Sequence, residues 1–296
     1  MNRLLTALHS VRRESENGGY LHALGWFARR FHLRWVRPHF EGRGPAGPGR
    51  PITIIIPAVD KDAEVLAECL QSVRAFVQDE VAALWIVAPE SARLRALAAA
   101  AGAELVPEDR ILPRPARELK TRGWVLQQLI KFNVCHHVAT ADYLVLDADT
   151  IFLRPQRFVR GGRGVLRYSD QYELLYNRCL ELIFGHRRRY PASFVTHHQL
   201  FAAAQVKALL AKIGQRFGCT WWEAILRDVD QGHLISFSEY ELYGHFVLEQ
   251  PGGQKQVVLE YWRGLDRDRS ELGTLDAVRT AARGRLNSVS FHQHTQ

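Results

Sequence analysis

Short β-branched runs alternate with longer amphipathic segments in the first half of the chain. The run Ile52 to Ile56 is apolar except for one threonine and ends at Pro57, which is typical of a strand buried on both faces of a parallel sheet. We expect further strands near 84–87, 104–106 and 143–146, and helices at about 60–77, 91–101 and 122–137. This alternation predicts an α/β domain, with a nucleotide-sized crevice where the strands end.

A stretch of glycine, proline and arginine divides the chain. Residues 41–51, EGRGPAGPGRP, cannot hold a regular element and are typical of a linker. The length of 296 residues fits one large domain with an appendage. We therefore expect a basic N-terminal segment with its linker at residues 1–47, and a single domain at residues 48–296.

The N-terminal segment carries large apolar residues at helical spacing, accompanied by arginines. The apolar stripe is Tyr20, Leu24, Phe27, Phe31 and Trp35, and the arginines are Arg29, Arg30, Arg34 and Arg37. A helix of this composition lies in the interface of an anionic membrane. The alternative is that the stripe packs onto the main domain, and the sequence leaves both open.

Composition narrows the compartment and the class of partner. The net charge of +8 favours anionic partners such as nucleotides or phospholipid head groups. The four cysteines include no C-x-x-C pair, which predicts neither a zinc site nor a disulfide framework. The chain has neither the features of a signal peptide nor an apolar run of about 18 residues. We expect a cytoplasmic protein, and membrane binding by the N-terminal stripe would place it peripherally on the inner face of the membrane.

Two aspartates follow the last of these predicted strands. Asp147 and Asp149 stand two apart, so an extended backbone would point both carboxylates the same way at the edge of the sheet. Mg²⁺ or Mn²⁺ held by such carboxylates neutralises a diphosphate as its sugar leaves. A bare D-x-D pair also caps turns, but the apolar strand before it and the apolar run Ile151 to Leu153 after it favour a metal site.

Four sequence blocks resemble the GT-A glycosyltransferases, and specifically a largely uncharacterised bacterial family with a GT-A-like fold. The blocks are WVLQQLIKF at 124–132, DYLVLDADTIF at 142–152, SFVTHHQLF at 193–201 and FSEYELYG at 237–244. The resemblance implies a single domain with a central mixed, mainly parallel sheet flanked by helices. It also implies a metal-dependent transferase that moves a sugar from a nucleotide-sugar donor to a glycan or lipid-linked acceptor.

The helix before the acidic pair supplies the predicted donor-binding side chains. Trp124, Gln128 and Lys131 follow an i, i+4, i+7 spacing and share one face. A lysine beside a glutamine would grip the phosphate and the sugar of the donor, whereas an ordinary amphipathic helix would turn the same face to solvent. We also expect Asp60 and Asp147 to bind the donor.

Two glutamates stand among aromatic residues in the last block. A carboxylate partly desolvated by aromatic rings has a raised pKa suited to a general base. An inverting enzyme would use such a base, and Glu239 or Glu241 is the predicted residue; the sequence leaves both an inverting and a retaining reaction open. Tyr240 and Tyr243 are predicted to bind the acceptor, because aromatic faces suit sugar rings. Ser238 and Glu241 also match a capping box, which is compatible with catalysis by Glu239.

Three histidines complete the predicted site. His197 and His198 are expected to contact the acceptor, although neighbours on a strand face opposite ways, so that one of them packs or is solvated. His292, near the end of the chain, resembles the histidine that completes the metal site in many GT-A enzymes, and imidazole is a suitable ligand for Mn²⁺.

Two other functions compete with glycosyl transfer. A haloacid-dehalogenase-type phosphatase or phosphotransferase would use Asp147 as its nucleophile, but its motif needs Thr or Val where Ile151 stands. A non-catalytic basic module would bind a membrane or nucleic acid. The basic residues are spread rather than striped and no nucleic-acid-binding signature occurs, so we expect no nucleic-acid partner.

Overall fold

The computed structural model describes residues 49–293 apart from 172–173, 187, 191, 230–236 and 283, and it describes residue 31 alone in the N-terminal segment. The predicted apolar stripe, except Phe31, and most of the linker therefore lie outside the described residues. The choice between membrane binding and packing stays a prediction, as does the boundary at residue 48.

The first strand of the structure is the β-branched run that the sequence predicted to be a strand. The strands are β1 (Ile52–Pro57), β2 (Val81–Ala88), β3 (Glu104–Pro107), β4 (Asp142–Leu146), β5 (Thr150–Phe152), β6 (Val159–Arg160), β7 (Arg163–Tyr168), β8 (His198–Ala202), β9 (Val257–Tyr261), β10 (Gly264–Asp268) and β11 (Ser288–His292).

The helices fall between these strands. They are η3 (Asp60–Asp62), α2 (Ala63–Phe76), α3 (Ala92–Ala100), α4 (Glu108–Ile111), α5 (Ala116–Leu119), α6 (Gly123–Asn133), η4 (Val134–His136), α7 (Leu174–Phe184), α8 (Ala203–Phe217), α9 (Trp221–Ala224), the π-helix η5 (Ile225–Val229), α10 (Glu239–Glu249), α11 (Gly253–Gln256), η6 (Arg269–Thr274) and α12 (Leu275–Ala282).

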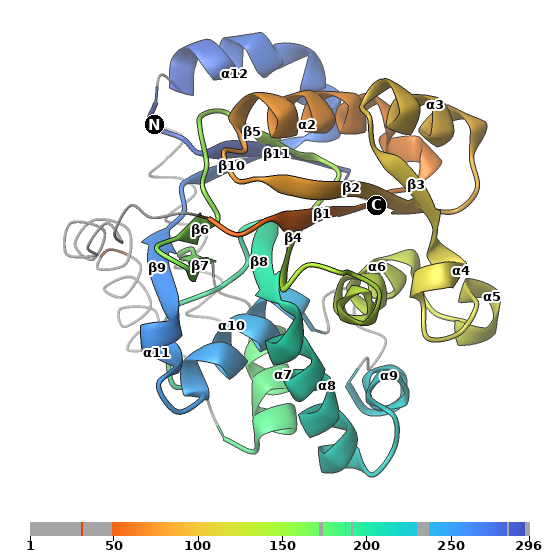
Figure 1. The fold of residues 1–296 in the computed structure, drawn as a ribbon, viewed down its shortest axis with the longest axis vertical. Helices are drawn as coiled ribbons and strands as arrows, with labels where there is room; N and C mark the ends of the chain where they lie inside the picture. The colour runs from red at the N-terminus through yellow and green to blue at the C-terminus, as the bar shows by residue number, and fades with distance from the viewer. Residues whose placement is uncertain are drawn as a thin grey trace.

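The central sheet has five strands in the order β3-β2-β1-β4-β8. The first four strands run parallel, and β8 pairs antiparallel with β4 at the edge. Helices α2 and α3 cover one face, and α6 lies on the other (Figure 1). A mixed, mainly parallel sheet flanked by helices is therefore confirmed.

Strand β1 shows why this sheet needs both layers. Ile54 and Ile56 pack with the apolar side chains of α2, whereas Ile55 packs on the opposite face with those of α6. All three side chains are fully buried. Because successive strand residues alternate between faces, an unbroken isoleucine run needs apolar partners on both sides of the sheet.

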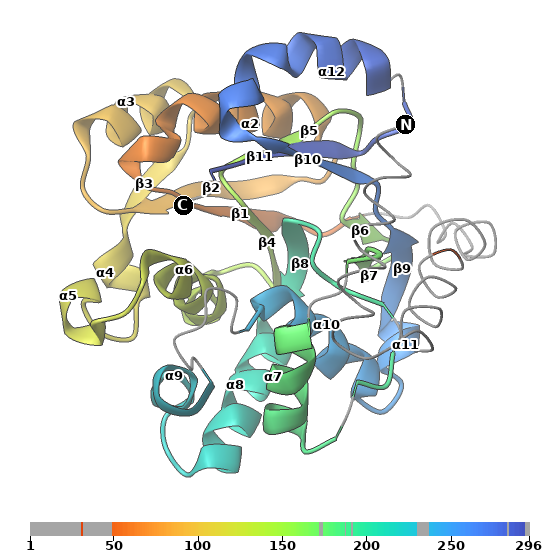
Figure 2. The ribbon, with the colours of Figure 1, turned by 180° about the vertical axis from the view of Figure 1, so that it is seen from behind.

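Helix α10 lies deep in the second layer, where it contacts α6, α7, α8 and β8 (Figure 2). Every residue from Glu239 to Leu248 is buried. Gly244 permits the close packing, because a Cβ atom there would lie 2.1 Å from the ring of Phe194. The N-terminus of α10 thus brings two carboxylates into the interior.

Two smaller sheets bring distant segments to the acidic pair. In the sheet β10-β11-β5, β11 pairs antiparallel with β5 and parallel with β10. This pairing sets the end of the chain beside the segment that follows Asp149, since Ser290 lies opposite Thr150. The other sheet has the order β6-β7-β9.

The four cysteines are free thiols. Among the described helices, none has both the length and the apolar character needed to cross a bilayer.

Candidate metal and donor site

The acidic pair lies in a turn at the end of β4. The amide N–H of Thr150 donates to the carbonyl oxygen of Asp147 at 3.1 Å, so residues 147–149 do not continue the strand. The expected extended backbone is therefore wrong at this point, because the chain must reverse to enter β5. The two carboxylates consequently have different partners.

The carboxylate of Asp147 pairs with a buried lysine. Lys131 Nζ lies 2.6 Å from Asp147 Oδ1 and 2.7 Å from Glu239 Oε1, and the Tyr240 hydroxyl donates to the same Asp147 oxygen at 2.9 Å. Burial disfavours the charge of Lys131, but the two carboxylates outweigh it and raise its pKa. Burial likewise opposes the charge on Asp147, yet Lys131 and His197 lower its pKa. The pair is therefore ionised on both sides.

The carboxylate of Asp149 faces the end of the chain. His292 Nδ1 lies 3.0 Å from Asp149 Oδ2, and His292 Nε2 lies 3.4 Å from Asp266 Oδ1. The other oxygen, Asp149 Oδ1, is buried with no hydrogen-bond partner among the residues that the structure describes. An unpartnered buried carboxylate oxygen is costly unless a ligand satisfies it.

His197 joins the two halves of the site. Its Nδ1 lies 3.5 Å from Asp147 Oδ2 and its Nε2 lies 3.3 Å from Asp266 Oδ1. The rings of His197 and His292 are 4.6 Å apart between centroids. Burial opposes protonation of both rings, but the carboxylates raise the pKa of His197 to about 10 and that of His292 to about 9.

The backbone of His197 is strained. Its φ is +60°, in the left-handed region, which costs a residue with a side chain on the order of 1 kcal/mol or more. The carbonyl oxygen of His197 accepts the amide N–H of Asp147 at 2.9 Å, which ties this loop to the acidic turn. These contacts hold the strained conformation, which places the imidazole among the carboxylates.

These side chains fit a divalent cation. The ligand atoms of His197, Asp266 and His292 lie within 4.8 Å of one another. We name the group made of these three residues and Asp149 the histidine–aspartate cluster. Its mixture of imidazole nitrogen and carboxylate oxygen suits Mn²⁺ better than Mg²⁺, which prefers oxygen ligands alone.

Asp266 was not predicted from the sequence as a site residue. It lies on β10, GLDRD, whose alternating charges give no apolar pattern, and it reaches the site through parallel pairing with β11. Hydrogen bonds from His197 and His292 overcome the effect of burial and hold the pKa of Asp266 well below its usual range.

The two predicted catalytic glutamates have different partners. Glu239 joins Lys131, and burial raises its pKa; its Oε2 has no hydrogen-bond partner among the described residues. Glu241 instead accepts the amide N–H of Phe194 at 3.2 Å and lies 3.3 Å from His245. Its carboxylate does not complete the predicted capping box, although Ser238 Oγ accepts the Glu241 amide N–H at 3.4 Å.

The predicted donor face of α6 is buried rather than solvated. Gln128 Oε1 accepts the amide N–H of Glu239 at 3.0 Å, so Gln128 fixes the start of α10. Trp124 packs edge-on against Phe237 at the outer end of this face. Asp60 is exposed beyond β1, where it accepts a hydrogen bond from Ser91 Oγ.

Two residues predicted to bind the acceptor do not join the cluster. His198 is fully buried against Trp262, with ring centroids 4.1 Å apart. Burial, and then the nearby Arg167, lower the pKa of His198 well below its usual range. Tyr243 accepts the amide N–H of Ala202 at 2.8 Å at the far end of β8, whereas Tyr240 reaches Asp147.

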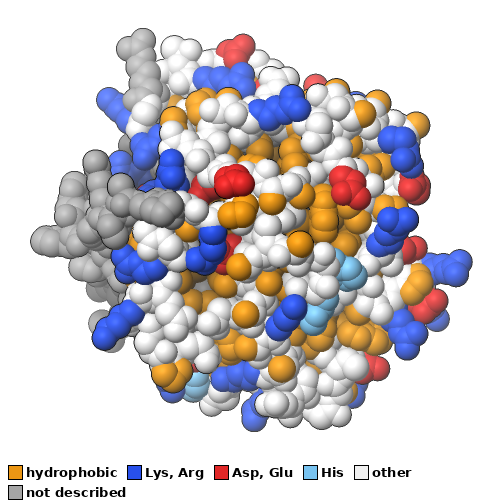
Figure 3. Space-filling model, in the orientation of Figure 1, with side chains coloured by type: hydrophobic (Ala, Val, Ile, Leu, Met, Phe, Trp, Pro, Cys, Tyr) orange, Lys and Arg blue, Asp and Glu red, His pale blue; other side chains and the backbone are white. Residues whose placement is uncertain are grey.

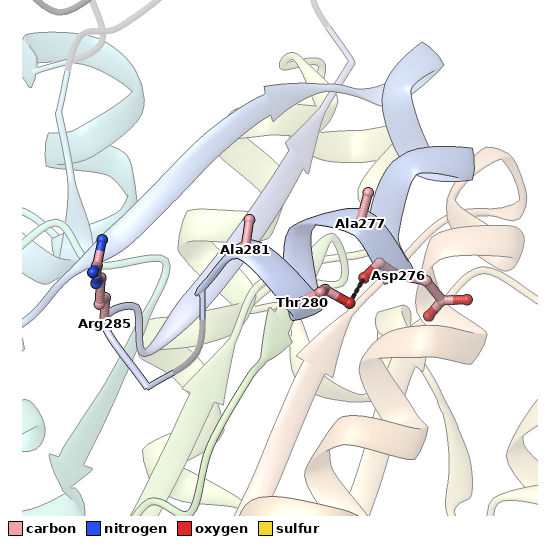
Figure 4. A pocket seen from close by; sticks show the side chains of 5 residues that line it. All are labelled: Asp276, Ala277, Thr280, Ala281 and Arg285. Atoms are coloured by element: carbon pink, nitrogen blue, oxygen red, sulfur yellow. Dashed lines mark hydrogen bonds between the residues drawn. The ribbon is translucent and has the colours of Figure 1, made fainter.

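A separate hollow of about 630 Å³ lies along α12, outside the cluster (Figure 4). Asp276, Ala277, Thr280, Ala281 and Arg285 line it, and the Thr280 hydroxyl donates to the Asp276 carbonyl of its own helix at 2.9 Å. Because Thr280 bonds to its own helix and Asp276 pairs with Arg279, we assign this hollow no role of its own.

A comparison with models of protein families shows which family the chain belongs to. The model of a family of unknown function (DUF6492) matches residues 50–281. The chain belongs to this family. This agrees with the resemblance to a largely uncharacterised family. A comparison with curated proteins gives no match.

Solved structures similar to this member of the family include a galactosyltransferase and a glucosyl-3-phosphoglycerate synthase. One is the galactosyltransferase LgtC in complex with donor and acceptor sugar analogs, with 15% identity, a TM-score of 0.44, and coverage of 83% of this chain and 88% of that chain. Another is glucosyl-3-phosphoglycerate synthase from Mycobacterium tuberculosis with Mn²⁺, uridine diphosphate and phosphoglyceric acid, with 14% identity, a TM-score of 0.44, and coverage of 79% and 77%. Similarity this low carries no argument about activity, so the function proposed below rests on the site.

Proposed function

We propose that this chain is a metal-dependent glycosyltransferase that takes its sugar from a nucleotide-sugar donor and passes it to a glycan or lipid-linked acceptor. The observation that carries the proposal is the histidine–aspartate cluster at the carboxyl end of β4, with the unpartnered oxygen Asp149 Oδ1 beside it. Ligands of α/β sheets bind at this edge.

Asp149, His292 and Asp266 would hold the cation, with His197 as a further ligand. Mn²⁺ bound there would neutralise the diphosphate that leaves the sugar. Asp147 is engaged by Lys131 and Tyr240, so we assign it to positioning and donor contact rather than to the innermost metal shell. This revises the expectation that both aspartates act as equivalent metal ligands.

Lys131 would supply positive charge next to the leaving diphosphate. Its ammonium group is fixed by Asp147 and Glu239, so no side-chain reorganisation is needed when negative charge develops nearby. Glu239 Oε2 is the free carboxylate atom of this group and our candidate for the general base. Its raised pKa brings it closer to the range in which a carboxylate can take a proton.

The competing functions receive less support. A phosphoaspartate enzyme needs a free nucleophilic oxygen, whereas Asp147 Oδ1 accepts hydrogen bonds from Lys131 and Tyr240, and Asp147 Oδ2 lies 3.5 Å from His197 Nδ1. A basic binding module needs its cations gathered, whereas lysines and arginines on the visible face are interspersed with acidic and apolar side chains (Figure 3).

The test is turnover of nucleotide sugars. Purified full-length protein is incubated with Mn²⁺ and a panel of UDP-, GDP-, dTDP- and CMP-sugars, and release of nucleotide is measured with and without EDTA. We expect Mn²⁺-dependent release of nucleotide from one donor class. Asp149→Asn should lose this release. Asp276→Asn, the control that removes an exposed carboxylate on α12, should keep it. Metal-independent release, equal in both variants, would refute the proposal. A phosphoaspartate trapped on Asp147 would favour the phosphatase.

A further inference from the structure

A second cavity of about 410 Å³ opens beside the histidine–aspartate cluster. His197 and Asp266 line it, and the remaining lining comes from the segments after β7 and before β8, from the end of β9 to the start of β10, and from the segment before β11. This volume falls within the range of about 300 to 1,000 Å³ for small-molecule sites. The cavity therefore has room for a sugar-sized ligand directly at the proposed metal.

The order of the strands places this cavity apart from the nucleotide crevice. Because β2 and β3 extend from one side of β1 while β4 lies on the other, the strand order reverses between β1 and β4, and ligands of α/β sheets bind at such a point. The cavity instead lies towards β8, since Val195, Thr196 and His197 line it and immediately precede that strand. A ligand in the cavity would therefore meet the cluster beside the start of β8 rather than at the crevice between β1 and β4.

The lining combines aromatic surface with two positive charges. Tyr261 and Trp262 are buried residues that contribute aromatic surface to the lining, while Arg263 and Arg285 are exposed at it. Among the described residues, neither guanidinium group has a hydrogen-bond or ion-pair partner. The acidic lining residues are already engaged: Asp266 binds the two histidines and Asp170 has a partner.

We infer that this cavity binds the acceptor, and that the acceptor is a saccharide carrying a phosphate or carboxylate group recognised by Arg263 and Arg285. A guanidinium group binds either anion through two parallel hydrogen bonds, and aromatic surface suits a sugar ring. The inference rests on the proposed function, because it names the second substrate of that reaction. It also explains why two unpaired arginines line a cavity next to the cluster.

The main competing occupant is the diphosphate of the donor, which the same arginines would bind. The two cases differ in what the arginine variants lose. If the arginines hold the acceptor, Arg263→Gln/Arg285→Gln keeps the affinity of the wild type for UDP with Mn²⁺. If they hold the diphosphate, the double variant loses that affinity, and the inference is wrong.

The experiment measures binding of four probes by calorimetry, with and without UDP and Mn²⁺: glucose 6-phosphate, glucuronic acid, glucose and inorganic phosphate. Glucose 6-phosphate or glucuronic acid should bind the wild type at least about tenfold more tightly than glucose does, the effect of one charge-assisted hydrogen bond. The preference should vanish in the double variant and persist in Arg117→Gln, which removes an exposed arginine on α5. Which of the two probes binds more tightly identifies the anionic group.

Three outcomes would overturn the inference: equal binding of glucose and both charged sugars, binding of inorganic phosphate as tight as that of the sugar phosphate, or no binding of any probe. If the proposed function itself is wrong, the wild type will bind no nucleotide with Mn²⁺. This result is distinct from the three outcomes above. The probe titrations without nucleotide still report on the cavity in that case.

Discussion

His292 Nδ1 lies 3.0 Å from Asp149 Oδ2 although 143 residues separate them in the chain. The contact exists because β11 pairs with β5, the strand that directly follows the acidic turn. The end of the chain is thereby part of the site, and the histidine predicted as a metal ligand stands next to the second aspartate. A cation bound by one of these side chains would lie within reach of the other.

Replacement of His292 should weaken metal binding without unfolding the protein. Its side chain is about one quarter exposed, so His292→Asn leaves no large cavity. Mutation of a group that only orients a metal ligand lowers the metal affinity about 10- to 100-fold. Mutation of a direct ligand should lower it at least as much. The measurement is the Mn²⁺ electron paramagnetic resonance signal of the free ion during titration. His136→Asn, which changes an exposed histidine, is the control, and equal affinity in both variants would exclude His292 as a ligand.

Lys131 should be essential for stability as well as for donor binding. Lys131→Met leaves the buried carboxylate of Glu239 and the partly buried carboxylate of Asp147 without their cation. Removing one partner of a buried ion pair costs about 3 to 5 kcal/mol. Urea unfolding of the variant should show this loss, and Lys131→Met/Glu239→Gln should recover part of it. If the double variant is no more stable than the single one, the two groups are not coupled.

Glu239 should be needed for transfer but not for donor binding. Glu239→Gln keeps the shape of the side chain but removes its ability to accept a proton. Because no other group takes over this role, kcat should fall by about 10²- to 10⁴-fold. The Kd for UDP with Mn²⁺, measured by calorimetry, should stay close to that of the wild type. Glu239 would instead be a structural partner of Lys131 if kcat were retained.

Glu241 should stabilise the fold in a pH-dependent way. Burial would raise its pKa, but Arg188 and His245 outweigh burial and hold the pKa below the ordinary value of 4.5. A carboxyl group whose pKa is lower in the folded state contributes stability above pH 4.5, and this stability is lost as the pH falls through the folded-state pKa. Urea unfolding at pH 7 and at decreasing pH below 4.5 should therefore show a smaller acid dependence in Glu241→Gln. An unchanged pH profile would contradict the assignment.

The sequence predicted the parts of the molecule that depend on local pattern. The isoleucines of β1, the strand β4 and the helix α6 are recognisable because each buries apolar side chains at a regular period. The turn at Asp147 was considered only as an alternative to an extended pair, since two aspartates fit either a strand end or a turn. Asp266 was missed because its role depends on non-local pairing of a charged strand, and no periodicity records such pairing.

The neighbouring histidines show the same division between local and non-local information. Alternation along a strand predicted different surroundings for His197 and His198; their surroundings do differ, but His197 is not part of the strand. Alternation could not predict that His197 lies just before β8 with a positive φ, because that conformation is imposed by contacts to the acidic turn.

The most direct test of the account is the effect of Mn²⁺ on nucleotide binding by the wild type and by Asp149→Asn. With UDP at about 100 times its Kd, linkage contributes about 2.7 kcal/mol, which raises the melting temperature of a domain of this size by roughly 5 to 10 °C. We predict this rise for the wild type with Mn²⁺, its absence with EDTA, and its absence in a folded Asp149→Asn protein. An equal rise in the variant, or a rise that persists in EDTA, would contradict a metal-dependent donor site at Asp149.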